Sequence, residues 1–427
     1  MNSLLTKLSA LLRSPTLTYT ALAILARASP LLLGPLYTRR LSTAEYGELA
    51  LLQTFAAILP MVASLGMQAA VTRFFFEEDK PAGLFRAGTV ARWISLFGIA
   101  TTILAVTAAM SIDAIGLGGW PPLTWSCLCV CVFALGSLVL SVPVALLRAQ
   151  QRPSAVGVLQ LGDFASMVGG GIVLVGALGL GLRGALGAML FNGLSNALLG
   201  FSYIFLRYRG DFAVSTLRQA LRFSLPFLPH FVANQLLTIG DRWVMSSFGL
   251  KAKLGTYALA SQLSSPASLV VGAWNDSASP RTGEVARTSG KAGMKAALWT
   301  ETRNYLVVAI GMGVLVSLAA PIVPFVFTRD FGDTALYLPV ICLSIVAEAA
   351  YYPMTNVIFF ANENRWIPVM TVTAGLVSLV ANVALIPVFG TWGALLSRLI
   401  AMSLRTGMAV YFARRALKVV GAMKESP

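Results

Sequence analysis

Polar side chains recur at helical spacing inside one long apolar run. At ~100° per residue, four of them would lie within ~80° of one another on one helix face. They are His230, Asn234, Thr238 and Asp241, with Arg242 at the border of the stripe. Such a face offers donors, acceptors and charge, so it favours binding of a charged, hydrogen-bonding molecule. For His230 itself, packing beside neighbouring prolines is favoured over proton transfer.

Further charges lie in other apolar runs. Arg398 and Arg405 are seven residues apart, so on a helix they share a face about two turns, or ~10 Å, from each other. Arg27, Asp163 and Glu348 each stand in a run of their own. These charges belong to the same kind of chemistry as the stripe, namely binding or ion pairing.

Catalytic chemistry finds no support in the sequence. His230 is the only histidine, and no nucleophile motif, metal-ligand spacing or nucleotide-binding glycine pattern occurs. Cys127, Cys129 and Cys131 lie in an apolar run without a histidine or acid nearby, so we interpret them as packing residues. We expect no catalytic residue, no metal and no cofactor.

The composition explains where these charges must reside. Hydrophobic residues make up 57% of the chain, charged residues only 11%, and mean hydropathy is +0.76. Soluble domains carry roughly 25% charged residues. Lipid must therefore cover most of the surface. The net charge of +15 fits a membrane protein with basic cytoplasmic loops, and we expect no binding of nucleic acid.

The apolar runs predict the transmembrane elements. A bilayer core of ~30 Å needs about twenty apolar residues per helix. About twelve runs meet this length, and they predict an all-α integral membrane protein. The runs are 16–38, 49–72, 89–111, 122–147, 154–178, 184–206, 224–249, 255–278, 303–327, 335–360, 366–387 and 391–413.

The distribution of Lys and Arg predicts the orientation. With both termini in the cytoplasm, 22 of the 32 basic residues fall on the inner side, six on the outer side and four within spans. Basic residues concentrate on the cytoplasmic side of membrane proteins. Both termini are therefore predicted to be cytoplasmic.

Short similarities predict an internal repeat. Residues 46–53 resemble 255–262, and the same offset of 209 superposes 184–186 on 393–395. These segments begin the second and eighth, and the sixth and twelfth, predicted spans. We expect two six-helix bundles, 1–210 and 211–427, that share an orientation as in parallel-repeat transporters.

The charges inside spans then allow two interpretations. An Arg or Asp at a helix centre costs ~2.5–3.5 kcal/mol in lipid, so it must face a partner or a wet cavity. One interpretation is a hydrated cavity that binds a charged substrate through Arg27, Arg242, Arg398, Arg405, Asn234 and Thr238. The other is buried pairing that fixes helix packing, with Asp241, Glu348 and Asp163 as the ion-pair or coupling candidates.

Five segments resemble the Wzx-type oligosaccharide flippases. The similarity covers the first outer loop, the end of the second helix, an inner loop, the seventh helix and the turn between the last two helices. The segments are Leu36–Gly47, Leu65-Gly66 with Arg73-Phe74, Arg148–Pro153, Phe223–Pro226 with Asp241–Trp243, and Asn382–Ala394.

This resemblance implies a fold and an activity. The superfamily of multidrug, oligosaccharidyl-lipid and polysaccharide exporters has two six-helix bundles around a V-shaped cavity and works by alternating access. Its flippases carry undecaprenyl-diphosphate-linked oligosaccharides to the outer leaflet of the bacterial inner membrane, for O-antigen, lipopolysaccharide or other surface polysaccharide biosynthesis. Implied partners are the lipid-linked substrate, membrane lipids, H⁺ or Na⁺ as coupling ion, and polysaccharide polymerase and chain-length proteins. Arg27 is an implied diphosphate contact, because related lipid II flippases use first-helix arginines.

Two alternatives stay open at this point. One is a cation-coupled exporter of drugs or other lipid-linked substrates, although the first span lacks the carboxylate that multidrug exporters of this superfamily often use. The other is a membrane-embedded glycan polymerase or ligase. Such enzymes need a large outer loop, whereas the longest here is about ten residues, as at Arg39–Glu48.

Overall fold

The computed structural model describes residues 29–77, 79–114 and 123–425, and nearly all of them are helical. No β-strand occurs in these ranges. The predicted spans are mostly helical wherever they fall in these ranges, so the all-α prediction is confirmed, but span 49–72 is interrupted by turns at residues 64–67. Arg27 lies outside the described residues.

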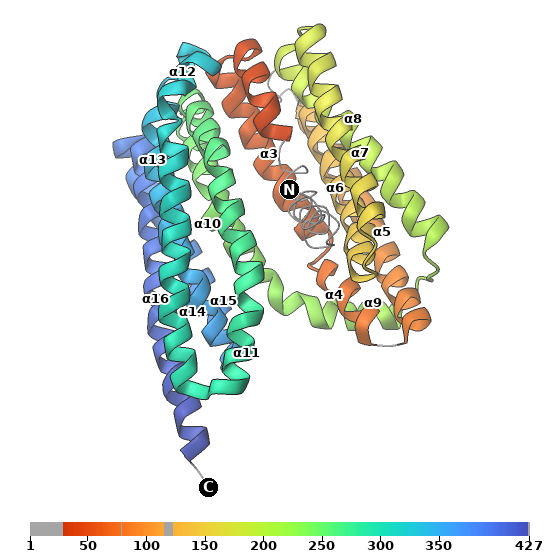
Figure 1. The fold of residues 1–427 in the computed structure, drawn as a ribbon. Coiled ribbons are helices and arrows are strands. Elements are labelled where there is room, and N and C mark those ends of the chain that lie inside the picture. Colours follow the sequence, from red (N-terminus) through yellow and green to blue (C-terminus); the bar gives the residue numbers. More distant parts are fainter. Residues whose placement is uncertain (1–28, 78, 115–122, 426–427) are drawn as a thin grey trace, which may run out of the picture. The chain divides into compact units, whose positions relative to one another are not determined.

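The chain divides into two compact units (Figure 1). Unit 1 comprises residues 51–228 and the segment that ends at Leu41. Its helices are one over 29–40, most of α3 (Thr43–Ala63), α4 (Gln68–Glu77), α5 (Lys80–Ala114), α6 (Leu123–Ala149), α7 (Pro153–Gly171), α8 (Gly181–Ser202) and α9 (Val214–Ser224). The π-helical turns Ile172–Ala177 and Tyr203–Arg207 extend α7 and α8.

Unit 2 comprises Ser42–Ala50 and the chain from Pro229 onward. Its helices are α10 (Leu228–Ser247), α11 (Lys251–Leu318), α12 (Val323–Val326), α13 (Thr334–Ala349), α14 (Tyr351–Phe360), α15 (Trp366–Phe389) and α16 (Thr391–Glu425). Short 3₁₀ turns lie at Ala320–Ile322 and Arg329–Phe331 of unit 2, and a third, Leu225–Phe227, ends unit 1 before α10.

Eight helical segments within the described ranges are long and apolar enough to cross a membrane. α10 and α16 are not among them. The reason lies in their sequences, because α10 carries Asp241 and Arg242 and α16 carries Arg398 and Arg405. The predicted number of about twelve transmembrane helices therefore stays a prediction, while multi-pass membrane insertion is established by the apolar helices.

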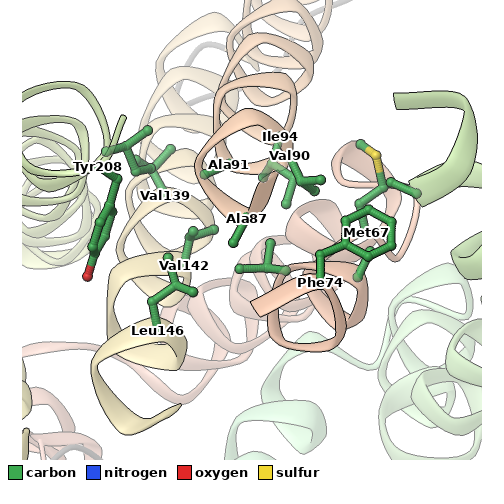
Figure 2. Close-up of a cluster of buried hydrophobic side chains, with 14 of the residues drawn as sticks. Met67, Phe74, Ala87, Val90, Ala91, Ile94, Val139, Val142, Leu146 and Tyr208 are labelled. Atoms are coloured by element: carbon green, nitrogen blue, oxygen red, sulfur yellow. The ribbon is translucent and has the colours of Figure 1, made fainter. Parts of the chain in front are cut away.

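The core of unit 1 combines aromatic side chains of α4 with small and branched side chains of α5 and α6. Figure 2 shows Phe74 of α4 beside Ala87 and Val90 of α5, with Val142 of α6 on the other side of α5. Ala87 and Val90 are fully buried. Lipid tails supply no hydrophobic drive for helix association, so membrane helices depend on close packing. Small residues permit that close approach.

Glycine sets the crossing of α6 and α8. A Cβ added to Gly193 would lie 2.6 Å from the backbone nitrogen of Phe133, and one on Gly136 would overlap the Gly193 carbonyl oxygen. Any larger residue at these positions would force the backbones apart. This crossing holds α8 in place, and α8 carries the polar residues of unit 1 described below.

In unit 2, α11 contains two of the predicted spans. Tyr305 Oη donates a hydrogen bond of 2.8 Å to Asn275 Oδ1, and Arg281 pairs with Glu301 at 3.6 Å. Residues 30 apart on a straight helix would be separated by ~45 Å. The helix therefore folds back on itself, as Figure 1 shows at its lower end, and spans 255–278 and 303–327 become antiparallel neighbours.

The first turns of α3 pack in unit 2 against the start of α11. A Cβ on Gly47 would overlap the Lys251 carbonyl oxygen, and one on Gly255 would overlap that of Thr43. Tyr46 Oη also donates to Gln262 Oε1 at 2.9 Å. The two segments that resemble each other in sequence thus meet at a reciprocal glycine contact.

In the second pair of similar segments, a glycine near the start of each helix packs against a carbonyl of the preceding helix. Gly184 begins its helix against the carbonyl of Leu174, and Gly393 begins its helix against that of Leu385. Neither position has room for a side chain. Equivalent use of the two glycines is consistent with a repeat, and the predicted bundles 1–210 and 211–427 remain a prediction.

Candidate functional site

Asp241 is the buried carboxylate of unit 2. It lies on α10 with 5% of its surface exposed, and it accepts a hydrogen bond from the phenol of Tyr257 on α11. Its Oδ1 also accepts from the Arg242 backbone nitrogen at 2.8 Å. Tyr257 is fully buried. Within the described part of the chain, this carboxylate is therefore held by hydrogen bonds and not by a direct ion pair.

Arg398 approaches the same region from α16. Its Nε donates to Ser344 Oγ on α13 at 2.9 Å, and Ser344 is 1% exposed. The guanidinium interacts electrostatically with Tyr257, Asp241 and Glu348. Among the described residues, Arg398 forms no ion pair with either acid. The arginine and the two carboxylates share one electrostatic neighbourhood without neutralising one another in contact.

Arg405 is a buried cation of the site. It is 7% exposed, and its guanidinium carbon lies 3.9 Å from the ring centroid of Tyr351 on α14. Within the described part of the chain its Nε has no hydrogen-bond partner and the side chain has no ion pair. A cation–π contact contributes up to about 2 kcal/mol, less than the several kcal/mol that burying a cation costs. Arg405 is thus a cation with unused capacity for an anion.

One residue of the polar stripe on α10, His230, interacts electrostatically with Arg405. Its Nδ1 is buried without a hydrogen-bond partner among the described residues. Thr238 donates to the backbone oxygen of Asn234 at 2.7 Å. The Thr238 hydroxyl therefore bonds to the backbone of its own helix. Asn234 is half-buried.

Glu348 and Arg242 complete the set on unit 2. Tyr352 interacts electrostatically with both Glu348 and Arg405. Arg242 is half-buried, and its Nε has no hydrogen-bond partner among the described residues. Seven of the predicted site residues therefore lie in unit 2: Asn234, Thr238, Asp241, Arg242, Glu348, Arg398 and Arg405.

Asp163 lies apart from them, in unit 1. Its Oδ1 accepts hydrogen bonds from the amides of Asn192 at 2.9 Å and Asn196 at 2.6 Å. Asn192 also donates to the Asp163 backbone oxygen and to Ser166. Both asparagines are at most 1% exposed. This carboxylate joins α7 to α8 through neutral amides, which is the geometry of a structural clamp.

Several partners in these clusters were not predicted from the sequence. Asn192 and Asn196 have the spacing of one helix turn inside an apolar run, a signal that was available. Tyr257, Ser344 and Tyr351 carry no such signal, because tyrosine and serine are ordinary in transmembrane helices. Their role depends on which helices pack together.

The fold and this site define an all-helical, multi-pass membrane protein with a cluster of charges inside its helices. A family model described as polysaccharide biosynthesis protein matches residues 14–286. The match covers more than half of the chain, which therefore belongs to the polysaccharide biosynthesis protein family.

Two similar proteins match most of this chain. A Haemophilus influenzae protein described as Lsg locus putative protein 1 is 22% identical over 365 residues, which cover 83% of this chain and 86% of the relative. An inward-facing multidrug resistance MATE family transporter of the MOP superfamily matches with a TM-score of 0.76 at 14% identity, over 94% of this chain and 96% of its own.

The lipid II flippase MurJ, in an inward closed conformation, matches with a TM-score of 0.73 at 14% identity, over 95% of this chain and 90% of its own. The similar solved structures are transporters and a flippase, not enzymes. The fold class expected from the sequence is thereby confirmed.

Proposed function

We propose that this protein transports a lipid-linked oligosaccharide with an anionic diphosphate from the cytoplasmic to the outer leaflet of the bacterial inner membrane, for surface polysaccharide biosynthesis. Family membership supports the polysaccharide pathway, and the MurJ-like fold supports a lipid-linked substrate. A sugar diphosphate cannot cross hydrocarbon unaided, because its charges would lose hydration. Its lipid tail can stay in the bilayer while the protein shields the polar part.

The single observation that carries this proposal is the environment of Arg405. Arg405 is 7% exposed and has no carboxylate partner among the described residues, so another group must compensate its charge. Tyr351 supplies part of that compensation, and a diphosphate would supply the rest. Arginine suits this role because its planar fork binds phosphate oxygens in pairs.

The experiment is a deletion strain complemented with variants. We expect the deletion to lose surface polysaccharide and to accumulate lipid-linked oligosaccharide in the inner leaflet. Arg405→Ala should fail to complement, while Arg405→Lys should keep part of the activity because a point charge still attracts phosphate. Arg414→Ala is the matched control, since Arg414 is an exposed arginine of the same helix.

Two results would contradict the proposal. One is normal surface polysaccharide in the Arg405→Ala strain at wild-type protein level. The other is a deletion strain that loses polysaccharide without accumulating a lipid-linked intermediate, which would favour a polymerase or ligase. Resistance to drugs that depends on this gene would instead favour the multidrug exporter.

Arg27 adds a second cation to the proposed route. We propose that it contacts the diphosphate from the first span, on the strength of its position in an apolar run before two prolines. Arg27→Ala should abolish export without preventing insertion, and Arg27→Lys should retain part of it. Normal surface polysaccharide in the Arg27→Ala strain would assign the residue a structural role.

Coupling to H⁺ or Na⁺ is proposed for Asp241 or Glu348. Both carboxylates lie near Arg398 without a direct ion pair among the described residues, so their charge is incompletely matched. If Arg398 moved away during transport, the carboxylate would bind a cation more readily. Transport by purified protein in vesicles should then respond to an imposed H⁺ or Na⁺ gradient, and that response should vanish in the coupling variant.

A further inference from the structure

A groove of about 690 Å³ lies along α9, outside the site described above. Among the described residues, its lining comes from α9 and the turn that follows: Val214, Leu217, Arg218, Leu221, Arg222, Leu225 and Pro226. At ~100° per residue, the six that precede the proline cover ~140° of the helix circumference. The groove is therefore one continuous face of a short helix.

The opposite face of α9 fixes the helix to unit 1. Ala220 and Ser224 are fully buried, and Gln219 accepts a hydrogen bond from Arg86 of α5 at 2.6 Å. The guanidinium of Arg73 on α4 lies 4.2 Å from the ring centroid of Phe223. Figure 1 shows α9 running across the ends of α4 and α5 rather than alongside them. The groove face is thereby directed away from the packed side of the helix.

The loop before α9 restrains it further. Thr89 Oγ1 donates to Asp211 Oδ1 at 2.8 Å, and the Ala213 backbone nitrogen donates to the same oxygen at 3.1 Å. These bonds join the start of α9 to α5. The helix is held at both its loop and its packed face, so the groove is a defined surface.

The groove combines an apolar stripe with two cations. Val214 is 60% exposed and Leu225 is 50% exposed, which is costly for a surface that faces water. Arg218 and Arg222 lie one turn apart at the edge of the stripe, both exposed. Among the described residues neither arginine forms an ion pair, and no acid lines the groove. The surface therefore complements a molecule with an apolar body and an anionic end.

We propose that this groove binds an anionic phospholipid of the membrane leaflet that α9 faces. The acyl chain would lie along Val214, Leu221 and Leu225. The phosphate would be bound between Arg218 and Arg222, whose Cβ atoms are about 5–6 Å apart at this spacing. An eleven-residue helix is too short to span a bilayer, and an apolar face edged by arginine is the form of a helix that lies in the membrane interface.

This proposal does not depend on the transported substrate. It uses residues of α9 alone and excludes Arg398 and Arg405. A phospholipid fits better than a soluble anion, because free phosphate would leave Val214 and Leu225 in water. It fits better than a soluble protein partner, because α9 packs on α4 and on the long apolar helix α5.

The test measures binding of fluorescent phosphatidylglycerol to the full-length purified protein in detergent micelles. Replacing both arginines, Arg218→Gln with Arg222→Gln, should weaken binding by roughly tenfold or more, as expected for two basic residues near an anionic lipid. Changing both to lysine should restore most of the affinity. Val214→Glu should also weaken binding, because it places a carboxylate on the acyl stripe.

A matched control removes the same charge outside the groove. Arg207→Gln with Arg209→Gln, both exposed residues of unit 1, should change the affinity less than twofold. Unlabelled phosphatidylglycerol should compete, whereas inorganic phosphate and phosphatidylcholine should not.

Three outcomes would overturn the proposal. Equal loss in the groove and control variants would mean general charge attraction. Equal competition by phosphatidylcholine would mean an apolar surface without headgroup recognition. Displacement by a lipid diphosphate and not by phosphatidylglycerol would assign the groove to the transported substrate instead.

Discussion

Unit 1 and unit 2 each hold a carboxylate on a helix, half-buried at Asp163 and buried at Asp241, and its partners differ between the units. In unit 1, Asp163 accepts hydrogen bonds from the amides of Asn192 and Asn196, which are neutral donors on a neighbouring helix. In unit 2, Asp241 accepts from Tyr257 and lies in the field of Arg398 without a direct ion pair in the described part. The first is a clamp between two helices, and the second belongs to a charged cluster.

The difference teaches how polar residues in lipid divide between structure and function. Amide donors are short and neutral, so they satisfy a carboxylate without needing a further partner. Arg398 and Arg405 form no ion pair among the described residues, and such a cluster can respond to an anion or a cation that enters it. We therefore expect variants of the unit 1 cluster to change stability and variants of the unit 2 cluster to change transport.

The largest effect is expected from reversing the charge of Arg398. Arg398→Glu should abolish complementation of the deletion strain, because three acids would then lie close together. Adding Asp241→Arg or Glu348→Arg should restore part of the activity if that acid exchanges with Arg398 during transport. Surface polysaccharide and membrane protein level are the two measurements. No recovery in either double variant would contradict the exchange model.

The two carboxylates can be compared directly by the same substitution. Asp241→Asn should reduce transport by more than tenfold, because it removes the charge that Arg398 faces. Asp163→Asn should keep most of the transport, since an amide oxygen can still accept from Asn196. The measurement is transport into vesicles at matched protein density. An equal loss of transport in both variants would contradict the proposed difference between the two carboxylates.

The asparagines of unit 1 are expected to act on stability. Asn192→Ala removes donors to Asp163 and Ser166 and leaves a carboxylate under-satisfied, which costs about 1–3 kcal/mol. We expect a lower Tm in detergent and unchanged transport per folded molecule. Asn196→Ala is the companion variant and should behave alike. A selective loss of transport at unchanged Tm would give this cluster a functional role.

The smallest effect is expected at Asp211, outside the spans. The Thr89 hydroxyl holds the pKa of Asp211 below its usual value, with help from the Ala213 backbone. A lowered folded pKa stabilises the protein above the unfolded value of about 3.9, and this contribution is lost as pH falls through the lower folded value. The Tm difference between wild type and Asp211→Asn should be constant above about pH 5 and shrink below about pH 4.

The control for that measurement is Thr89→Val, which removes the first donor. The Tm difference between the Thr89→Val variant and the Thr89→Val, Asp211→Asn double variant should depend less on pH. A pH dependence that survives unchanged in the Thr89→Val background would show that another group is responsible.

The sequence alone determined the membrane class, the helical fold and the positions of nearly all helices. The physical reason is that lipid requires long apolar helices, and apolar runs of that length are visible in one dimension. Helical spacing also placed Arg398 and Arg405 on one face of α16. The sequence identified Asp163 and Asp241 as charges in apolar runs, but it treated them as members of one set.

Only the tertiary structure decided which charges meet. Asp163 accepts hydrogen bonds from amides and Asp241 accepts one from Tyr257, although both are single acids in apolar sequence runs. Arg405 packs against the ring of Tyr351, and the Thr238 hydroxyl donates a hydrogen bond to the backbone of its own helix. Spacing fixes the face of a residue within its helix, whereas the partner depends on the rotation and depth of other helices. Those are set by non-local packing at positions such as Gly47 and Gly255, where the absence of a side chain lets two backbones touch.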